Sequence, residues 1–324
     1  MSAPAPRRDT RGIVDPAGLL SRVRFRRHLP APQLRPYLEH YWLIDWELPE
    51  PYASHVVPHP SVNVVFQRYG PLGSPAAGGS TSAEVAGIGL GLFTHKLEEA
   101  GRVCGIQFRP GGFRPFAPAW PVSTWTGRRV PLTEVFPDAA DPTDTGTGAG
   151  AERDTGTGAG AERGTDTGTG AERGTDTGAA SGVPAAVLSP DEDHARVAAL
   201  DAFLLAHGPA PDPAADLAVE LVELVRSDRT IRRASRLATA SGLSARSLQR
   251  LFASRVGVGP KWVILRYRIH EALERAEAAE TAGTPDWAAL AAELGYSDQA
   301  HLVRDFTATI GVPPTAYARG PSVP

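Results

Sequence analysis

The sequence predicts an α+β multidomain protein: a β-rich, barrel- or sandwich-like domain, a disordered repeat linker, and an all-α domain with two helix-turn-helix units. Three observations lead to this prediction. The 324 residues exceed the usual length of one domain, a ten-residue repeat interrupts the chain, and the apolar spacing changes from strand-like before the repeat to helical after it. The expected segments are a disordered N-terminus at 1–20, the β-rich domain at 21–137, the linker at 138–183, connecting helices at 184–226 and the helical domain at 227–320.

Short apolar runs separated by turns predict the β-rich domain. The run at residues 55–66 has β-branched and alternating apolar positions, and residues 85–93 and 101–108 are further apolar runs bounded by glycine. Turn signals such as Arg109-Pro-Gly-Gly112 lie between the runs, at intervals expected of an antiparallel barrel or sandwich.

The linker is predicted from units such as DTGTGAGAER, which repeat with a period of ten residues between Asp138 and Gly182. For burial these units offer only alanine, threonine and glycine, so stacked units would have no apolar core. We therefore expect a flexible tether with a root-mean-square span of about 35 to 40 Å.

The helical domain contains one unit twice. The pattern Leu-x-Arg-x-Phe-x-x-x-x-Gly-Val-x-Pro starts at Leu248 and again 54 residues later at Leu302. A glycine precedes each copy, Gly242 and Gly295, where a helix can end in a left-handed residue. Each copy therefore predicts two helices joined by a tight turn. The expected positions are about 234–253 for the first unit, 259–279 for a linking helix and 286–307 for the second unit.

The second helix of each unit has an apolar face and a polar face. Residues four apart lie on one side of a helix, so we expect two pairs to face the core: Leu248 with Phe252 and Leu302 with Phe306. Ser244 and Asp298 directly precede these helices and are placed to cap them. A plain pair of packed helices would show the same apolar spacing, so the charge pattern decides between the two interpretations.

A strongly basic window surrounds the first unit, although the net charge of the whole chain is −3. Ten Arg or Lys residues and no Asp or Glu lie between Arg229 and His270. A window of one sign around a helix-turn-helix is typical of a surface that binds the phosphate backbone of DNA. A linking helix of about 20 residues would be ~30 Å long, which suits two successive major grooves ~34 Å apart.

A longer string in the second unit is more specific. It runs Gly295-Tyr-Ser-Asp-Gln-Ala-His-Leu-Val-Arg-Asp-Phe306 and is followed by Gly311-Val-Pro-Pro314. With the first copy at the right distance, residues 227–319 resemble the C-terminal domain of the AraC/XylS family of bacterial transcription regulators. The resemblance implies a seven-helix domain, with two helix-turn-helix units joined by a long helix, that binds a double-stranded DNA operator. One departure is Val312-Pro313, where the family commonly has Ser or Thr before the proline.

The front half is similar to an uncharacterised, cupin-like sensor domain of some members of that family. The strings that carry this similarity are His40-Tyr-Trp42, Pro58-His-Pro-Ser-Val-Asn63 and Phe108-Arg-Pro-Gly-Gly-Phe113. The similarity implies that the domain binds an effector or mediates dimerisation, and it identifies no ligand. RNA polymerase, a small-molecule effector and a second copy of the chain are therefore further candidate partners.

Donor-bearing residues on the outer faces of the two recognition helices are the candidate DNA contacts. Arginine can pair bidentately with guanine and glutamine with adenine. The predicted base-reading residues are Arg246, Gln249, Gln299 and His301. The predicted phosphate contacts, which set position rather than sequence, are Ser244, Arg250, Arg304 and Lys261. We expect the first unit to discriminate more strongly, because Asp298 and Asp305 bring negative charge to the second.

The sequence favours a regulator over an enzyme. No Ser-His-Asp order, phosphate loop or carboxylate pair stands out, and the histidines of the front half lack metal-ligand spacing. Cys104 lies in an apolar run typical of a core residue. We expect no cofactor and no metal. Two alternatives stay open: a cupin-type metalloenzyme with a helical scaffold domain, and a nucleoid-type or RNA-binding adaptor without sequence preference.

The compartment is predicted from what the sequence lacks. A single cysteine cannot form an internal disulfide. No stretch is apolar enough for a membrane span, and the first residues have no apolar signal-peptide region. We therefore expect a cytoplasmic protein that does not insert into a membrane.

Overall fold

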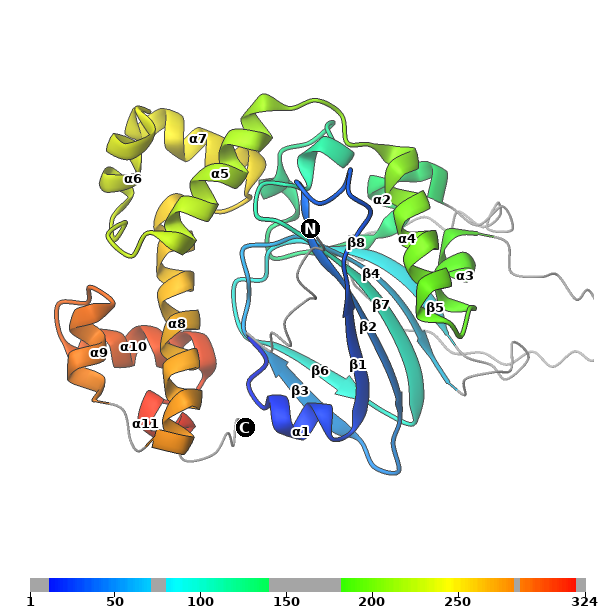
Figure 1. Ribbon diagram of the computed structural model, residues 1–324, viewed down its shortest axis with the longest axis horizontal. Coiled ribbons are helices and arrows are strands. Elements are labelled where there is room, and N and C mark those ends of the chain that lie inside the picture. The colour runs from blue at the N-terminus through cyan, green and yellow to red at the C-terminus, as the bar shows by residue number, and fades with distance from the viewer. Residues whose placement is uncertain (1–11, 71–79, 140–181, 283–285, 319–324) are drawn as a thin grey trace, which may run out of the picture.

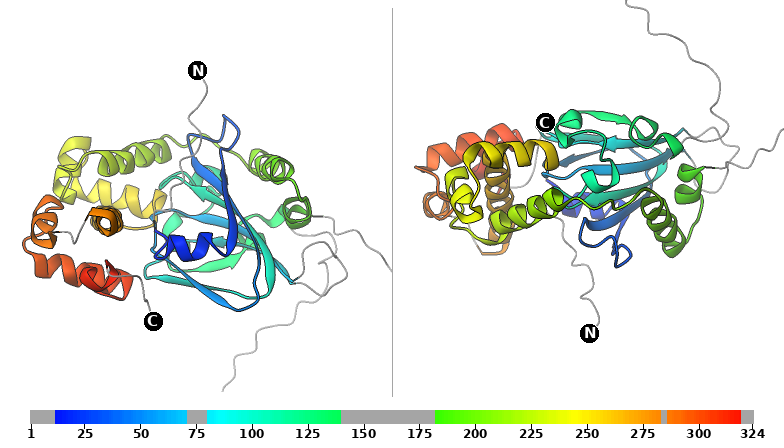
Figure 2. Two further views of the ribbon diagram at one scale, coloured as in Figure 1. Left: turned by 60° about the horizontal axis from the view of Figure 1, so that its bottom comes forward. Right: turned by 90° about the horizontal axis from the view of Figure 1, so that it is seen from above.

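The computed structural model describes residues 12–70, 80–139, 182–282 and 286–318. Within these ranges a β-domain stands beside a helical domain, and α8 (Pro260–Ala282) runs along the border between them (Figures 1 and 2). Most of the predicted linker and the first 11 residues lie outside the described residues.

The β-domain consists of two antiparallel sheets. The larger has the strand order β1 (Val23–His28), β2 (Leu38–Glu47), β7 (Ala100–Phe108), β4 (Asn63–Tyr69), β5 (Thr81–Ala86) and β8 (Arg129–Pro131). The smaller pairs β3 (Tyr52–Val56) with β6 (Phe93–Leu97). Because the two sheets do not join, the domain is sandwich-like rather than a closed barrel (Figure 1).

The remaining secondary-structure elements of the described chain are helices. Short turns in the β-domain are α1 (Pro16–Leu20), η1 (Arg114–Phe116), η2 (Val122–Trp125), α2 (Leu132–Val135) and η3 (Pro137–Ala139). On the face of the large sheet away from α8 lie α3 (Val183–Leu188) and α4 (Asp193–His207) (Figure 1). The helices of the helical domain, besides α8, are α5 (Pro213–Ser227), α6 (Ala234–Ser241), α7 (Ala245–Arg255), α9 (Trp287–Glu293), α10 (Gln299–Ile310) and α11 (Pro314–Tyr317). Within the described ranges, none of these helices combines the length and the apolar character needed to span a bilayer.

The large sheet has two different faces, because side chains alternate along a strand. On one face, buried side chains such as Leu43 and Ile106 pack in the core that includes α3 and α4. On the other face, Trp46 and Val103 cluster with Leu97 of the small sheet. The sheet therefore carries the main core on one side and a concave surface on the other.

Two of the predicted strands are divided in the structure. The run at residues 55–66 contains two prolines, which cannot donate a hydrogen bond to a sheet, so β3 ends before them and β4 begins after them. The run at residues 85–93 is split between β5 and β6. Gly87 lies in the break, where a Cβ atom would come within 1.9 Å of the carbonyl oxygen of Trp125.

Part of the predicted disordered N-terminus is ordered. Ile13 forms a β-bridge with Val56, and α1 follows it. Ile13, Val14 and Leu19 are buried, and this apolar burial helps to offset the chain entropy lost on ordering. The expectation of disorder is therefore wrong for residues 12–20. It is also wrong at the start of the predicted linker, where Ala139 is buried at the end of η3.

A charged cluster fixes α3 and α4 to the large sheet. Asp45 of β2 accepts hydrogen bonds from Arg26, Arg102 and Arg196 at 2.6, 2.7 and 3.2 Å. Arg26 is also paired with Asp193, the first residue of α4. The buried guanidinium groups of Arg102 and Arg196 donate further hydrogen bonds to carbonyls at the end of α3 and in the turn before α4.

Two hydrophobic clusters divide the helical domain. The first is continuous from the large sheet through α4 and α5 to α6 and α7, and it includes Leu248 and Phe252. The second joins α8 to α9, α10 and α11, and it includes Phe306 together with Val14 and Val57 from the β-domain. The two helical units therefore pack on the β-domain through separate cores.

Candidate nucleic-acid interface and interdomain pocket

The first helix-turn-helix unit consists of α6 and α7. Gly242 ends α6 in the left-handed conformation, with φ at 67°. The Ser244 hydroxyl accepts a hydrogen bond from the backbone N–H of Ser247 at 3.1 Å and so caps α7, as predicted. Leu248 and Phe252 are buried. The opposite side of the first turns exposes Ala245, Arg246, Gln249 and Arg250, in the half of a recognition helix that reaches base edges.

The second unit, α9 and α10, repeats this geometry. Gly295 has φ at 77°, and the Asp298 carboxylate accepts a hydrogen bond from the backbone N–H of His301 at 2.7 Å. Leu302 and Phe306 are fully buried. The residues exposed on the first turns of α10 are Gln299, Ala300, His301 and Arg304.

His301 is more engaged inside the unit than the sequence predicts. Its ring lies 3.6 Å from Asp305, 3.2 Å from the Ser297 hydroxyl and 5.4 Å from the ring of Tyr296. By contrast, the side chains of Gln299 and Arg304 form no hydrogen bond with another described residue. The second unit therefore offers DNA fewer free donors than the first.

The basic window divides into two groups. Arg255 is paired with Asp212 at 3.1 Å and Arg229 with Glu271 at 2.8 Å. Arg232, Arg266 and Arg268 are also used inside the molecule, in contacts with backbone carbonyls. The other half of the window is exposed and forms neither hydrogen bonds nor ion pairs with other described side chains; it consists of Arg233, Arg236, Arg246, Arg250 and Lys261.

Arg266 lies at the border between the two domains. It is 6% exposed, its guanidinium lies 4.5 Å from the ring centre of Trp262, and it donates one long hydrogen bond, 3.4 Å, to the carbonyl of Leu90. Its Nε and Nη1 atoms have no hydrogen-bond partner among the described residues. Burial lowers the pKa of Arg266 to about 10. In this arrangement the residue cannot contact DNA.

The two units are held at a set distance. The 23 residues of α8 span about 34 Å at ~1.5 Å per residue, close to one turn of DNA. The units lie toward opposite ends of this helix (Figure 1). Arg232, which precedes α6, donates to the carbonyl of Glu293 at the end of α9 at 2.6 Å, and Arg268 of α8 donates to the carbonyl of Arg232. These bonds fix one unit relative to the other.

Residues 237–320 match the model of a family described as a helix-turn-helix domain. The match includes both recognition helices and the whole of α8. The C-terminal part of this chain is an AraC-type helix-turn-helix domain. With this domain the protein is a DNA-binding transcription regulator.

In front of the AraC-type domain, residues 26–131 match a family described as a domain of unknown function (DUF6597). No curated protein matches the chain. Two solved structures of ToxT from Vibrio cholerae are similar to it, each with a TM-score of 0.37. One is 10% identical and covers 92% of this chain and 98% of ToxT. The other, described with an unsaturated fatty acid bound, is 12% identical and covers 90% and 96%. These values describe a distant similarity.

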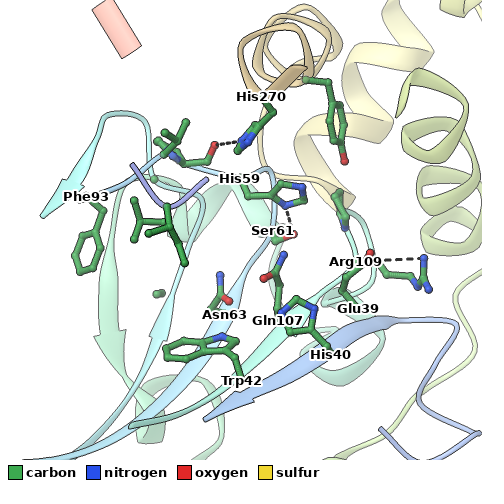
Figure 3. A pocket seen from close by; sticks show the side chains of 18 of the residues that line it. Glu39, His40, Trp42, His59, Ser61, Asn63, Phe93, Gln107, Arg109 and His270 are labelled. Carbon is green, nitrogen blue, oxygen red and sulfur yellow. Dashed lines mark hydrogen bonds and ion pairs between the residues drawn. The ribbon is translucent and has the colours of Figure 1, made fainter. Parts of the chain in front are cut away.

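A pocket of about 860 Å³ lies between the β-domain and the helices of the AraC-type domain. The concave face of the large sheet forms its inner wall (Figure 3). The other wall includes Val222 and Arg226 of α5 and Ile264, Tyr267 and His270 of α8. A molecule in this pocket would therefore contact both domains.

Charged residues at the mouth of the pocket are paired across the domain border. The Glu39 carboxylate of β2 lies 3.4 Å from Arg109 and 3.6 Å from Arg226 of α5. Arg226 is also paired with Glu223 at 2.8 Å. Hydrogen bonding to Glu223 and the charges of both carboxylates outweigh burial and raise the pKa of Arg226. These ion pairs join β2 to α5 at the border of the pocket.

The pocket wall is the part of the site that sequence reasoning missed. His40, Asn63 and Gln107 come from three different strands and meet only when the sheet forms (Figure 3). His40, Trp42, His59 and Asn63 do stand in the strings that carry the resemblance of the front half to a sensor domain. These strings were the signal from which the pocket residues could have been found. The spacing of the strings along the chain does not by itself predict that their residues meet in one pocket.

His59 connects the pocket to the linking helix of the AraC-type domain. Its ring lies 5.6 Å from the rings of both Tyr267 and His270, and its Nδ1 lies 2.7 Å from the Ser61 hydroxyl (Figure 3). His270 in turn contacts the carbonyl of Pro58 at 3.1 Å. Ser61, which lines the pocket, is therefore connected to α8 through a single intervening side chain, that of His59.

Asp212 forms a second link between the domains. Its carboxylate is 3.2 Å from Arg114 of the β-domain and 3.1 Å from Arg255 at the end of α7, and it caps α5 through the N–H groups of Ala214 and Ala215. Burial would raise the pKa of Asp212, but these hydrogen bonds and charges hold it below its ordinary value. The position of α7 is therefore tied directly to the β-domain.

The cysteine and the histidines considered as catalytic or metal-binding candidates have surroundings typical of residues that stabilise the fold. Cys104 is fully buried, and burial raises the pKa of its thiol to about 12, so it is a core residue as expected. Nowhere in the described ranges do three or more His, Cys, Asp or Glu side chains come together as a metal site would require. His55 contacts the Thr94 hydroxyl at 3.0 Å.

Proposed function

We propose that this regulator is sequence-specific, that α7 and α10 enter two successive major grooves of one operator, and that a small molecule in the interdomain pocket controls this binding. The observation that carries the proposal is the pairing of two exposed, donor-bearing recognition helices with a linking helix one DNA turn long. In this proposal the base-reading residues are Arg246, Gln249, Gln299 and His301, and the phosphate contacts are Ser244, Arg250, Arg304 and Lys261.

Control by a small molecule is supported by the composition of the pocket wall. The same wall contains the concave sheet, α5 and α8. A ligand that binds one relative position of the domains better than another shifts the equilibrium between them by its difference in affinity. Because α8 carries both units, a shift of α8 against the sheet changes how the two recognition helices meet DNA.

Binding-site selection from random duplex DNA with the full-length protein tests the DNA part of the proposal. We expect an enriched motif with two blocks whose centres lie about 10 base pairs apart. A palindromic motif of twice that length would reveal a second copy of the chain as a partner. Binding without any enriched motif would contradict the proposal and support the adaptor without sequence preference.

Replacing Arg246 by Ala is expected to relax specificity at one base pair, by ~1 to 3 kcal/mol, because a bidentate contact with guanine is lost. Arg304→Ala is the matched control, since a lost phosphate contact should weaken binding to all sequences alike. Both variants go through the same selection, followed by affinity measurements on single-base variants of the selected site. A motif that is identical for wild type and Arg246→Ala would contradict the assignment of Arg246.

A further inference from the structure

Three polar side chains form a row across the concave face of the large sheet. Asn63 of β4 is opposite Gln107 of β7, and His40 of β2 is opposite the same Gln107. All three line the pocket (Figure 3). Directly opposed residues have Cβ atoms ~5 Å apart, so the row presents a polar line about 10 Å long.

The two amides in this row differ in their hydrogen bonding from a third amide on the same face. Neither the Asn63 nor the Gln107 side chain forms a hydrogen bond with another described residue. Gln67, which follows on the same face of β4, differs: it donates to Ser82 at 3.0 Å and accepts from Tyr69 at 3.4 Å. A carboxamide carries two donor hydrogens and one acceptor oxygen. Asn63 and Gln107 therefore offer two complete sets of donors and acceptors to a ligand.

An indole ring lies beside the amide row. Trp42 is opposite Gly105, two residues from Gln107 along β7. A Cβ atom at Gly105 would be 2.0 Å from Cε2 of the indole and 2.1 Å from Cζ2, so the ring occupies the space that a side chain there would fill. The indole thus lies across β7 and forms part of the pocket wall. A flat aromatic surface of this kind binds planar rings by stacking.

Beyond Trp42 the wall becomes apolar. The next row contains Phe25, Ile44 and Val103, which are paired in register and line the pocket. At the other end, the mouth carboxylate of Glu39 is already paired with two arginines. Arg27 of β1 is opposite Trp42 and also lines the pocket, and its guanidinium lies 5.2 Å from the ring centre of Phe25. The part of the wall formed by β2, β4 and β7 thus favours a ligand with one hydrogen-bonding edge, a flat body and an apolar far side.

We propose that the pocket binds an uncharged planar heterocycle with a lactam or carboxamide edge. Its edge pairs with Asn63 and Gln107, its face stacks on Trp42, and its apolar side points toward Ile44 and Val103. A sugar, with hydroxyl groups around its whole ring, would place some of them unpaired against the apolar row, which is costly. The inference rests on the proposed function only in treating this ligand as the effector.

The test is calorimetric titration of the full-length protein with isoquinolin-1(2H)-one, a neutral planar lactam. A dissociation constant of about 0.1 to 1 mM is expected for a ligand of this size. Its ring-saturated analogue, which cannot stack, and the charged 1-naphthoate should each bind about tenfold more weakly or worse. Glucose and oleate represent the two other ligand classes. Tighter binding of either one, or of 1-naphthoate, than of the lactam would overturn the proposal.

Variants locate the binding site. Asn63→Leu and Gln107→Met keep the side-chain volume and should each weaken lactam binding by about tenfold, as expected for lost hydrogen bonds in a desolvated site. Gln67→Met is the matched control and should change lactam affinity less than about twofold, because the Gln67 amide is bonded internally. Equal affinity of wild type and both row variants would also overturn the proposal. The comparison of ligands on the wild-type protein stays decisive if a variant fails to fold.

The selection of an operator is measured on the same preparation. An enriched motif without lactam binding would overturn this inference and leave the DNA-binding proposal standing. Lactam binding that depends on Asn63 and Gln107, but without any enriched motif, would support the inference and overturn the DNA-binding proposal.

Discussion

Replacing Asp45 by Ala is expected to lower the free energy of unfolding by about 3 to 5 kcal/mol, the range measured when one partner of a buried ion pair is removed. Asp45 is the shared acceptor of Arg102 and Arg196, whose side chains are only 5% and 1% exposed. Without it, both guanidinium groups lose a counter-charge in a desolvated position. We expect the contact of α3 and α4 with the large sheet to weaken first.

Chemical denaturation of both proteins measures this effect. Asp191→Ala is the matched control, because Asp191 contacts the same Arg102 at 3.0 Å but is 86% exposed, and an exposed pair contributes about 0 to 1 kcal/mol. Similar losses in the two variants would contradict the role given to Asp45.

The contribution of Asp45 has a defined pH dependence. Burial would raise the pKa of its carboxyl, but the hydrogen bond from Arg102 and the charge of Arg196 hold it below the ordinary value of 3.8. The stabilisation is therefore complete above the pKa of the unfolded chain and is lost as the pH falls through the lower pKa of the folded state. The difference between wild type and Asp45→Ala should be constant near neutral pH and shrink in acid below about pH 4.

Replacing Phe306 by Ala is expected to release the second helix-turn-helix unit. Phe306 is fully buried, and its ring lies 5.8 Å from Tyr317 and 6.5 Å from Trp287. Truncation of a buried Phe to Ala costs about 3 to 5 kcal/mol. Because this cluster is separate from the main core, we expect α9 to α11 to loosen while the sheet and the first unit stay folded.

Hydrogen exchange and DNA footprinting measure the two consequences. Amides of α9 to α11 should exchange faster, whereas those of β2 and β7 keep their protection. The footprint should lose one block of about 10 base pairs. Phe252→Ala is the matched variant in the main core, and it should reduce the protection of α6, α7 and the sheet together. A footprint of full length with Phe306→Ala would contradict the two-groove arrangement.

The recognition helices could be predicted because their signals are local. Gly242, Ser244 and the pair Leu248 and Phe252 lie within 11 residues of each other, and each specifies a helix end, a cap or a buried face on its own. The structure has all of them in the predicted roles. The exposed positions between them then follow from the helix period.

The pocket and the ionic contacts could not be predicted in the same way. Asn63 and Gln107 meet through a strand pairing that spans 44 residues, and Arg255 reaches Asp212 across 43. Such pairings depend on the strand order and on how the domains pack, which no local pattern encodes. For the same reason the charge of the basic window overestimates the charge available to DNA, because half of it is used inside the fold.

The buried guanidinium of Arg266 affects how permanent the contact between the domains is. A shift of the pKa from 12.5 to about 10 corresponds to roughly 3 kcal/mol against the charged form of this buried side chain. At the border Arg266 is buried with one long hydrogen bond, to the carbonyl of Leu90, so the contact of α8 with the β-domain is less stable there than apolar packing of the same area would be. A cation that is buried with few partners thus limits the stability of the border between the two domains.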